Sequence, residues 1–303
     1  MSSRIFIDGQ AGTTGLGIAQ RLEQAGGFSL VTLPEARRKD SEARAEAMGR
    51  ADLTVLCLPD DAAREAVAIA PQGARILDAS TAHRVAPGWE YGFAELMPGQ
   101  AEKIAGAARV ANPGCYATGA IALLRPLMAL GLLTAEARLS INAVSGYSGG
   151  GKAMIAEHEA AGGPAFELYA LGLKHKHLPE IMRYGGLSRA PIFVPSVGHF
   201  AQGMLVCIPL HLDQLAKAGS AVQLAEAYAE YYAGAETISV HRGIWGENLD
   251  PQALNNTNRL EIFVTANEDA EQAVLIARLD NLGKGASGAA VQNIKLMLGM
   301  ENG

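Results

Sequence analysis

Short apolar segments alternate with amphipathic ones through the first third of the chain. Residues 4–8, 28–33, 53–58 and 75–78 are predicted to form strands, and residues 18–25, 41–48 and 62–70 are predicted to form helices. The segment 53–58 is almost continuously apolar, which is typical of a parallel strand buried on both faces. Repeated strand–helix units of this length predict right-handed crossovers and a parallel sheet.

The pattern changes after residue 112. Helices are predicted from residue 115 to about 130 and from 220 to 233, and a final helix ends near 298. Strands are predicted near residues 139–144, 191–196, 203–212, 236–241, 259–266 and 273–280. The predicted fold class is therefore α/β, with a Rossmann-type parallel-sheet domain and a second, α+β domain that contains a mixed or antiparallel sheet.

Composition excludes several classes of protein. The 303 residues are 49% hydrophobic and 18% charged, so a disordered chain is not expected. A formal net charge of -6 argues against nucleic-acid binding through a basic surface. No run of about 20 apolar residues and no signal-peptide pattern is found, so no membrane association is expected. Three cysteines without disulfide or metal-ligand spacing favour the cytoplasm, a reducing compartment, and no metal site.

A glycine-rich turn joins the first predicted strand to the first helix. Its cofactor-binding candidates are Gly9, Gly12, Thr13, Thr14 and Gly15. Glycine lets the backbone approach a dinucleotide pyrophosphate, and a helix N-terminus offers N–H groups to the phosphates. The spacing differs from the standard fingerprint, so the alternative is a tight turn without a ligand.

The choice of nicotinamide cofactor depends on the end of the second strand. Glu35 there would suit a ribose hydroxyl, whereas the basic residues that follow, Arg37, Arg38 and Lys39, would suit a 2′-phosphate. We predict NADP, with Arg37 as the phosphate ligand. The alternative is a solvated charged loop.

Ligands of an open parallel sheet bind beyond the carboxyl ends of its strands. The segment that follows the strand 75–78 contains Ser80 and Thr81, which we expect to contact the cofactor, and Arg84, a candidate ligand for a substrate phosphate. Each of these could instead belong to an ordinary surface loop.

Cys115 differs from the other two cysteines in its setting. Cys57 and Cys207 lie within apolar strands, whereas Cys115 follows Asn112-Pro113-Gly114 and begins a helix. A helix N-terminus stabilises a thiolate, and its N–H groups can serve as an oxyanion hole. Cys115 is therefore the candidate nucleophile, and a buried structural thiol is the alternative. Asn112, in the same motif, is expected to contact the substrate.

A nucleophilic cysteine needs a proton partner, and the chain contains seven histidines. His199 follows an apolar strand in Val194-Pro195-Ser196-Val197-Gly198 and is our choice for the acid/base group. Lys174 and His177 belong to a cationic segment that could hold an anionic substrate or simply lie in solvent. A second glycine-rich loop contains Ser145, Gly146 and Tyr147, a further candidate for the substrate phosphate.

Taken together, these segments resemble a known family. Residues 9–15, 78–84, 112–118, 145–151, 174–181 and 283–293 resemble, in this order, segments of the N-acetyl-gamma-glutamyl-phosphate reductases, in their shorter variant. The pair of motifs Asn-Pro-Gly-Cys-Tyr and Ser-Gly-Tyr-Ser-Gly-Gly-Gly-Lys is the specific part of this resemblance. The family is related to aspartate-semialdehyde dehydrogenase, and its fold is similar to that of glyceraldehyde-phosphate dehydrogenase.

The resemblance implies an NADP-binding Rossmann domain of residues 1–112 and 283–303, because the C-terminal helix of such enzymes returns to the first domain. Residues 113–282 would form a catalytic and oligomerisation domain of a homodimer or homotetramer. The implied reaction is the NADPH-dependent reduction of a small acyl phosphate, N-acetyl-glutamyl 5-phosphate, in arginine biosynthesis. The products would be the 5-semialdehyde and phosphate, formed through a thioester on Cys115.

One position departs from the family pattern. The longer variant has its catalytic histidine directly after a proline, and here Ser196 occupies that place. His199 lies three residues later, in an arrangement similar to the histidine loop of aspartate-semialdehyde dehydrogenase. Two other functions stay open: an aspartate-semialdehyde or lysine-pathway reductase of the same chemistry, and a nucleotide-responsive binding protein without catalysis.

Overall fold

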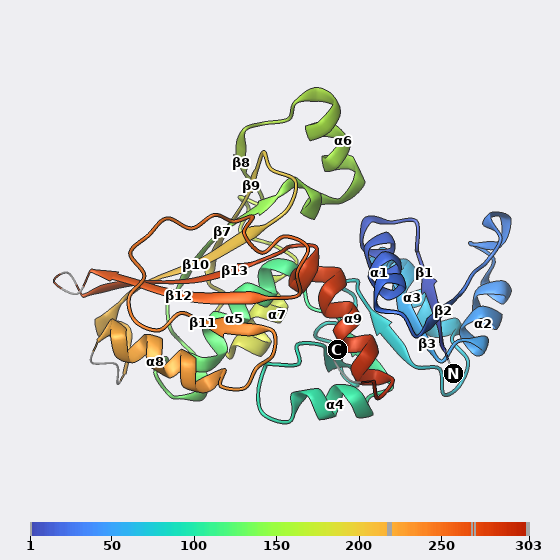
Figure 1. Ribbon diagram of the computed structural model, residues 1–303, viewed down its shortest axis with the longest axis horizontal. Coiled ribbons are helices and arrows are strands. Elements are labelled where there is room, and N and C mark those ends of the chain that lie inside the picture. Colours follow the sequence, from blue (N-terminus) through green and yellow to red (C-terminus); the bar gives the residue numbers. More distant parts are fainter. Residues whose placement is uncertain (1, 217–219, 268, 270, 301–303) are drawn as a thin grey trace. The chain divides into compact units, whose positions relative to one another are not determined.

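The computed structural model describes residues 2–216, 220–267, 269 and 271–300 (Figure 1). The chain divides into two compact units, one of residues 1–114 and 286–303 and one of residues 115–285. The sequence prediction put the corresponding boundaries after residues 112 and 282. Residues 301–303 of its last segment lie outside the described part of the chain.

The first unit contains a six-stranded parallel sheet in the order β2-β1-β3-β4-β6-β5. Its strands are β1 (Ser3–Asp8), β2 (Phe28–Val31), β3 (Leu53–Leu56), β4 (Ile76–Asp78), β5 (Glu90–Tyr91) and β6 (Arg109–Ala111). Its helices are α1 (Thr13–Ala25), α2 (Ser41–Arg50), α3 (Asp60–Ile69), α4 (Gln100–Gly106) and α9 (Gly288–Met297).

Alternate residues of these strands face two separate apolar cores. Ile5 and Ile7 of β1 pack in one core with α1 and α9, and Phe6 packs in the other with α2 and α3. The C-terminal helix supplies Ala290, Ile294 and Met297 to the first core. This unit is a doubly wound sheet, which puts the carboxyl ends of all its strands at one edge.

The second unit contains a seven-stranded mixed sheet in the order β11-β12-β13-β10-β7-β9-β8. Its strands are β7 (Ser140–Gly146), β8 (Phe166–Leu168), β9 (Ile192–Gly198), β10 (Met204–His211), β11 (Ile238–Val240), β12 (Leu260–Asn267) and β13 (Gln272–Leu279). Its helices are α5 (Cys115–Ala129), α6 (Gly151–Ala161), α7 (Leu178–Gly185) and α8 (Ala221–Tyr231).

Only one face of this sheet is covered by helices in the described part of the chain. Helices α5 and α8 pack on β10, β12 and β13, and α7 packs against α5 (Figure 1). Alternate residues of β10 are fully buried on that side, such as Val206 and Ile208, whereas Leu205 and Cys207 on the other side are only partly buried. The sheet therefore presents a second, open apolar face.

The predicted fold class is confirmed, and several short elements were missed. Helices α4, α6 and α7 and strands β5, β6 and β8 were not predicted. Strands of two or three residues are too short to show an alternating pattern. Helix α6 follows the glycine-rich loop directly and has a weak apolar stripe, because Met154 and Ile155 are its only large apolar residues.

Candidate active site

The first glycine-rich turn packs as a nucleotide-binding turn requires. Gly9 has a φ of 87°, and a side chain on it would lie 2.3 Å from the carbonyl oxygen of Cys57. A side chain on Gly15 would lie 2.7 Å from the carbonyl oxygen of Gly9. The turn is closed by a 3.0 Å hydrogen bond from Gly12 N–H to that same carbonyl. Helix α1 then begins at Thr13 and Thr14, so its first N–H groups face the end of β1.

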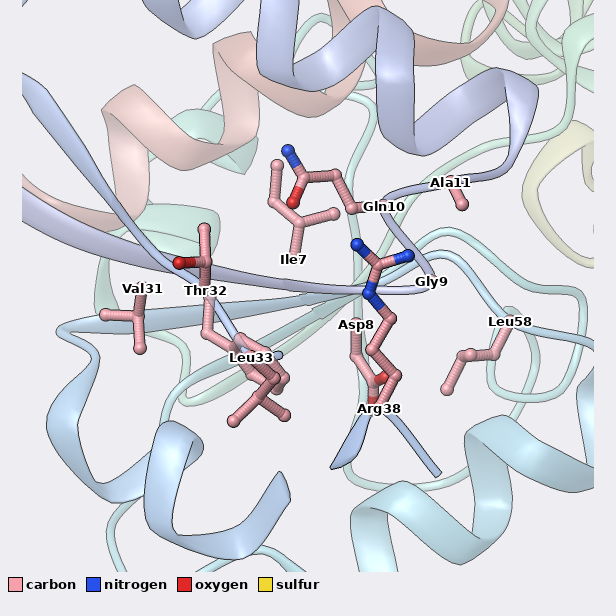
Figure 2. Close-up of a pocket in the computed structure, with 11 residues that line it drawn as sticks. Ile7, Asp8, Gly9, Gln10, Ala11, Val31, Thr32, Leu33, Arg38 and Leu58 are labelled. Atoms are coloured by element: carbon pink, nitrogen blue, oxygen red, sulfur yellow. The ribbon is translucent and has the colours of Figure 1, made fainter. Parts of the chain in front are cut away.

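A cleft of about 180 Å³ lies between this turn and the end of β2 (Figure 2). Arg38 lines it, with its guanidinium group directed toward Gly9 and Gln10 (Figure 2). Arg37, the residue chosen from the sequence, forms a 3.3 Å ion pair with Asp40 and is not among the residues that line the cleft. The structure therefore places Arg38 rather than Arg37 at the cleft.

The other charged group at the cleft, Asp8, is already paired. Its Oδ2 accepts hydrogen bonds of 2.9 and 2.7 Å from Nε and an Nη of Arg44 on α2, and both side chains are buried. Burial raises the pKa of Asp8, and the Arg44 guanidinium partly opposes that rise. Because Arg44 offsets the carboxylate, Arg38 gives the cleft its positive charge.

Ser80 and Thr81 lie at the carboxyl end of β4, as expected, but their hydroxyl groups donate within the protein. Ser80 Oγ donates to Asp78 at 2.7 Å, and Thr81 Oγ1 donates to Asp60 at 2.5 Å. Asp78 also bonds Nδ1 of His83 at 2.6 Å. Ser80 and Thr81 therefore use their hydroxyl hydrogens within the protein. Toward a ligand, these hydroxyls can only accept hydrogen bonds.

Cys115 is the first residue of α5 and is partly exposed. The two other thiols differ: burial raises the pKa of Cys57 to about 12 and that of Cys207 to about 11. Gly285 packs against Cys115 so closely that a side chain there would lie 2.8 Å from Cβ of Cys115. All three thiols are partly exposed, and Cys115 is the one that lies at a helix N-terminus.

A cluster of aromatic and histidine rings surrounds the next residue, Tyr116. Its ring centroid lies 5.9 Å from that of His175, 6.1 Å from His177 and 6.5 Å from Tyr169. Tyr116 donates a 2.8 Å hydrogen bond to the carbonyl of Ser196. Burial raises the pKa of Tyr116 above its usual range and that of Tyr169 to about 12. Both phenols therefore stay neutral near pH 7, and neither can take a proton from a thiol.

The two histidines of this cluster have different partners. His175 Nδ1 accepts a 3.1 Å hydrogen bond from the backbone N–H of His177, and its Nε2 lies 3.4 Å from the hydroxyl of Tyr169. Both ring nitrogens of His175 are thus engaged. The ring of His177 is buried at the N-terminus of α7, with its centroid 6.1 Å from that of Tyr116 and 4.7 Å from that of His175. Lys174, by contrast, is exposed.

His199, the acid/base candidate from the sequence, belongs to another group of rings. Its Nδ1 lies 2.9 Å from Nδ1 of His158 on α6, and both histidines pack against Tyr147. The glycine-rich loop itself is tightly packed: Ser145 Oγ donates to the Gly146 carbonyl at 3.1 Å, and a side chain on Gly146 would lie 2.5 Å from Gln202 N. The structure joins His199 to the Ser145–Gly151 loop through Tyr147.

Sequence reasoning did not single out Tyr116, His158 or Tyr169, and it chose Arg37 from the basic run that also contains Arg38. Tyr116 lies inside the cysteine motif, so its position was a usable signal. Tyr169 lies in residues 163–173, which show no periodic pattern. Within the described ranges no helix is long and apolar enough to cross a membrane. No group of three or more metal-ligating side chains was found in the same residues.

Comparison with known proteins identifies the family. The chain is 54% identical to N-acetyl-gamma-glutamyl-phosphate reductase 2 of Pseudomonas putida over 303 residues, which cover 97% of this chain and 96% of the relative. The chain belongs to the N-acetyl-gamma-glutamyl-phosphate reductase family. The resemblance derived from the cysteine motif and the glycine-rich loops is thereby confirmed.

Two further findings describe the architecture of the chain. Residues 115–281 match the family model for the semialdehyde dehydrogenase dimerisation domain. The fold is that of aspartate semialdehyde dehydrogenase II of Vibrio cholerae, crystallised with ASA, at a TM-score of 0.76 and 16% identity over 98% of each chain. The Candida albicans aspartate semialdehyde dehydrogenase with NADP matches at a TM-score of 0.66 and 12% identity, over 98% of this chain and 99% of that one.

Proposed function

We propose that this chain reduces N-acetyl-glutamyl 5-phosphate with NADPH to N-acetyl-glutamate 5-semialdehyde and phosphate, in arginine biosynthesis. The observation that carries the proposal is Cys115, a partly exposed thiol at the first residue of α5, in a chain of this family. Aspartate-semialdehyde reduction is less favoured, because the likeness to those enzymes is one of fold.

The chemistry follows from the sulfur. The Cys115 thiolate attacks the acyl carbon, the carbon–oxygen bond to phosphate breaks, and a thioester forms. Bound NADPH would supply the hydride that reduces the thioester carbon. The resulting thiohemiacetal then collapses to the aldehyde, and the carbon–sulfur bond returns its electron pair to Cys115. Backbone N–H groups at the start of α5 would stabilise the oxyanion of each tetrahedral species.

NADP is the cofactor that suits the first unit. The Gly9–Gly15 turn allows a pyrophosphate to approach the start of α1, and the cleft beside it contains Arg38. An arginine at the end of the second strand suits a ribose 2′-phosphate. Arg38 would bind that phosphate, in place of the Arg37 predicted from the sequence.

His177 is our proposal for the group that exchanges protons with the thiohemiacetal. It packs beside Tyr116, the neighbour of the nucleophile, and is buried at the N-terminus of α7. His199 would act on the Ser145–Gly151 loop through Tyr147, and Lys174 would attract the anionic substrate. Three free cysteines, one of them the nucleophile, favour a reducing compartment, and we propose the cytoplasm.

We propose a homodimer as the smallest assembly. The open face of the second sheet has a hollow of about 350 Å³ lined by Val144, Val194 and Leu205, and Phe166 and Leu168 at its edge are half exposed. Sheets with two apolar faces are covered on both. A second copy of the same sheet would cover this one, in agreement with the dimerisation-domain match over residues 115–281.

Replacement of the nucleophile tests the function. Cys115→Ala should abolish phosphate-dependent oxidation of N-acetyl-glutamate 5-semialdehyde with NADP, while NADP still binds with wild-type affinity. Cys207→Ala, which removes a thiol from β10, is the matched control and should keep its turnover. Turnover by Cys115→Ala near the wild-type rate would refute the proposal, as would a clear preference of the wild type for aspartate semialdehyde.

A further inference from the structure

Four hydrogen bonds hold Asn112, three residues before Cys115. Its N–H donates to the carbonyl of Asp78 at 2.7 Å, and its carbonyl accepts from Nε of Arg84 at 3.0 Å. Its side-chain Nδ2 donates to the carbonyl of Ala286 at 3.0 Å, and its Oδ1 accepts from Nδ2 of Asn293 at 3.0 Å. Every polar group of Asn112, which is 2% exposed, therefore has a partner in the protein.

The partners of Asn112 are themselves fixed by packing. Arg84 is 8% exposed and also donates to the carbonyl of Ala79 at 3.3 Å. Asn293 is 1% exposed and donates a second bond, of 2.8 Å, to the carbonyl of Gly92. A side chain on Gly92 would lie 2.4 Å from Nδ2 of Asn293, so this amide fills its space. Buried networks of this kind tolerate few alternative arrangements.

The same network holds the second segment that contacts Cys115. Ala286, which accepts the bond from Asn112, directly follows Gly285, and Gly285 packs against the backbone of Cys115. The network thus joins the segments that lead into Cys115 and out of Gly285: Asn112 lies three residues before Cys115, and Ala286 directly follows Gly285.

We propose that Arg84, Asn112 and Asn293 are positioning residues that fix the turn leading into Cys115, the first residue of α5. The inference rests on the proposed role of Cys115 as the nucleophile. Stabilisation of a thiolate by a helix terminus falls off within the first turn, so the reactivity of the sulfur depends on where the preceding turn places it. The guanidinium and amide groups act on the sulfur only through that turn.

The test measures thiol reactivity separately from substrate binding. In the free wild-type enzyme, iodoacetamide should label Cys115 selectively near neutral pH, because burial raises the pKa values of Cys57 and Cys207 to about 12 and about 11. In Arg84→Gln and Asn112→Ala, labelling of Cys115 should slow by about tenfold and shift toward higher pH. The kcat should fall in proportion, and the KM for the acyl phosphate should stay at its wild-type value.

Arg84→Lys separates geometry from charge. Lysine keeps the charge but cannot reproduce the planar fork that bonds the carbonyls of Asn112 and Ala79, so labelling should stay slow. This variant also replaces Arg84→Gln if that one does not fold. The matched control is Arg75→Gln: Arg75 donates to the carbonyls of Ala105 and Ala107 at 2.9 and 3.1 Å, and its loss should lower the melting temperature without changing the labelling of Cys115.

Three outcomes would overturn the inference. A raised KM with wild-type labelling would make Arg84 or Asn112 a substrate ligand. If Arg84→Gln and Asn112→Ala kept wild-type labelling, kcat and KM, then Arg84 and Asn112 would have no role in the reaction. Full recovery of labelling by Arg84→Lys would point to charge rather than position. If the wild type labels as expected but does not turn over the semialdehyde, the proposed function fails and the positioning inference stands.

Discussion

Gly285 lies so close to Cys115 that it leaves no room for a side chain of its own. A methyl group on Gly285 would lie 2.8 Å from Cβ and 3.2 Å from Cα of Cys115, and 3.1 Å from the carbonyl oxygen of Asp280. None of these atoms belongs to the flexible end of a side chain. Cys115 can therefore occupy the first turn of α5 only if residue 285 has no side chain.

Gly285→Ala should consequently damage both stability and reactivity. We expect the free energy of unfolding to fall by about 1–3 kcal/mol, as for other overpacked sites, and labelling of Cys115 by iodoacetamide to slow. Chemical denaturation and labelling kinetics measure the two effects. Gly106→Ala is the control, because a methyl group at that position in α4 meets no atom within 4 Å. If Gly285→Ala matched Gly106→Ala in both its free energy of unfolding and its labelling of Cys115, the close packing of residue 285 against Cys115 would be contradicted.

Cofactor preference should depend on Arg38 and not on its neighbour. Arg38→Ala should weaken NADPH binding by about 10–100-fold, the value of one or two charge-assisted hydrogen bonds, and leave NADH binding unchanged. Arg37→Ala removes an adjacent guanidinium that is paired with Asp40 and should bind NADPH as the wild type does. Fluorescence titration gives both affinities. A larger loss in Arg37→Ala would restore the assignment predicted from the sequence.

Two histidine variants distinguish the proposals for proton transfer. His177→Asn should lower kcat by about 10²–10⁴, the usual contribution of a general acid/base, because His177 packs beside Tyr116. His199→Asn should have the smaller effect and should mainly raise KM, since it loses the 2.9 Å bond to His158 beside the glycine-rich loop. Steady-state kinetics give kcat and KM for both variants. A larger loss of kcat in His199→Asn than in His177→Asn would make His199 the acid/base group.

Assembly should depend on the open face of the second sheet. Leu205→Lys puts a charge among the residues that line the hollow, and we expect it to convert a dimer to monomers in sedimentation velocity. Val222→Lys, at an exposed apolar position on α8, is the control and should sediment as the wild type does. Unchanged sedimentation of Leu205→Lys would place the interface elsewhere.

Much of the fold and part of the candidate site could be predicted from the sequence, because they depend on local patterns. The remainder depends on short turns and on contacts between distant residues. The parallel sheet and the second, mixed sheet follow from local periodicity, and Cys115 follows from a loop–helix junction. Which of two adjacent arginines faces the cleft depends on the short 3₁₀ turn Glu35–Arg37, which no periodic pattern shows. The bond between His158 and His199 joins α6 to the loop after β9, a pairing over 41 residues that local patterns do not encode.

The first unit is built from both ends of the chain. Helix α9 contributes Ala290, Ile294 and Met297 to a core that also contains Ile5, Leu53 and Val110. A ribosome delivers these three residues after the whole of the second unit. The first unit therefore completes its core only after the second unit has been synthesised, and a nascent chain stalled before residue 288 would expose that apolar surface to chaperones.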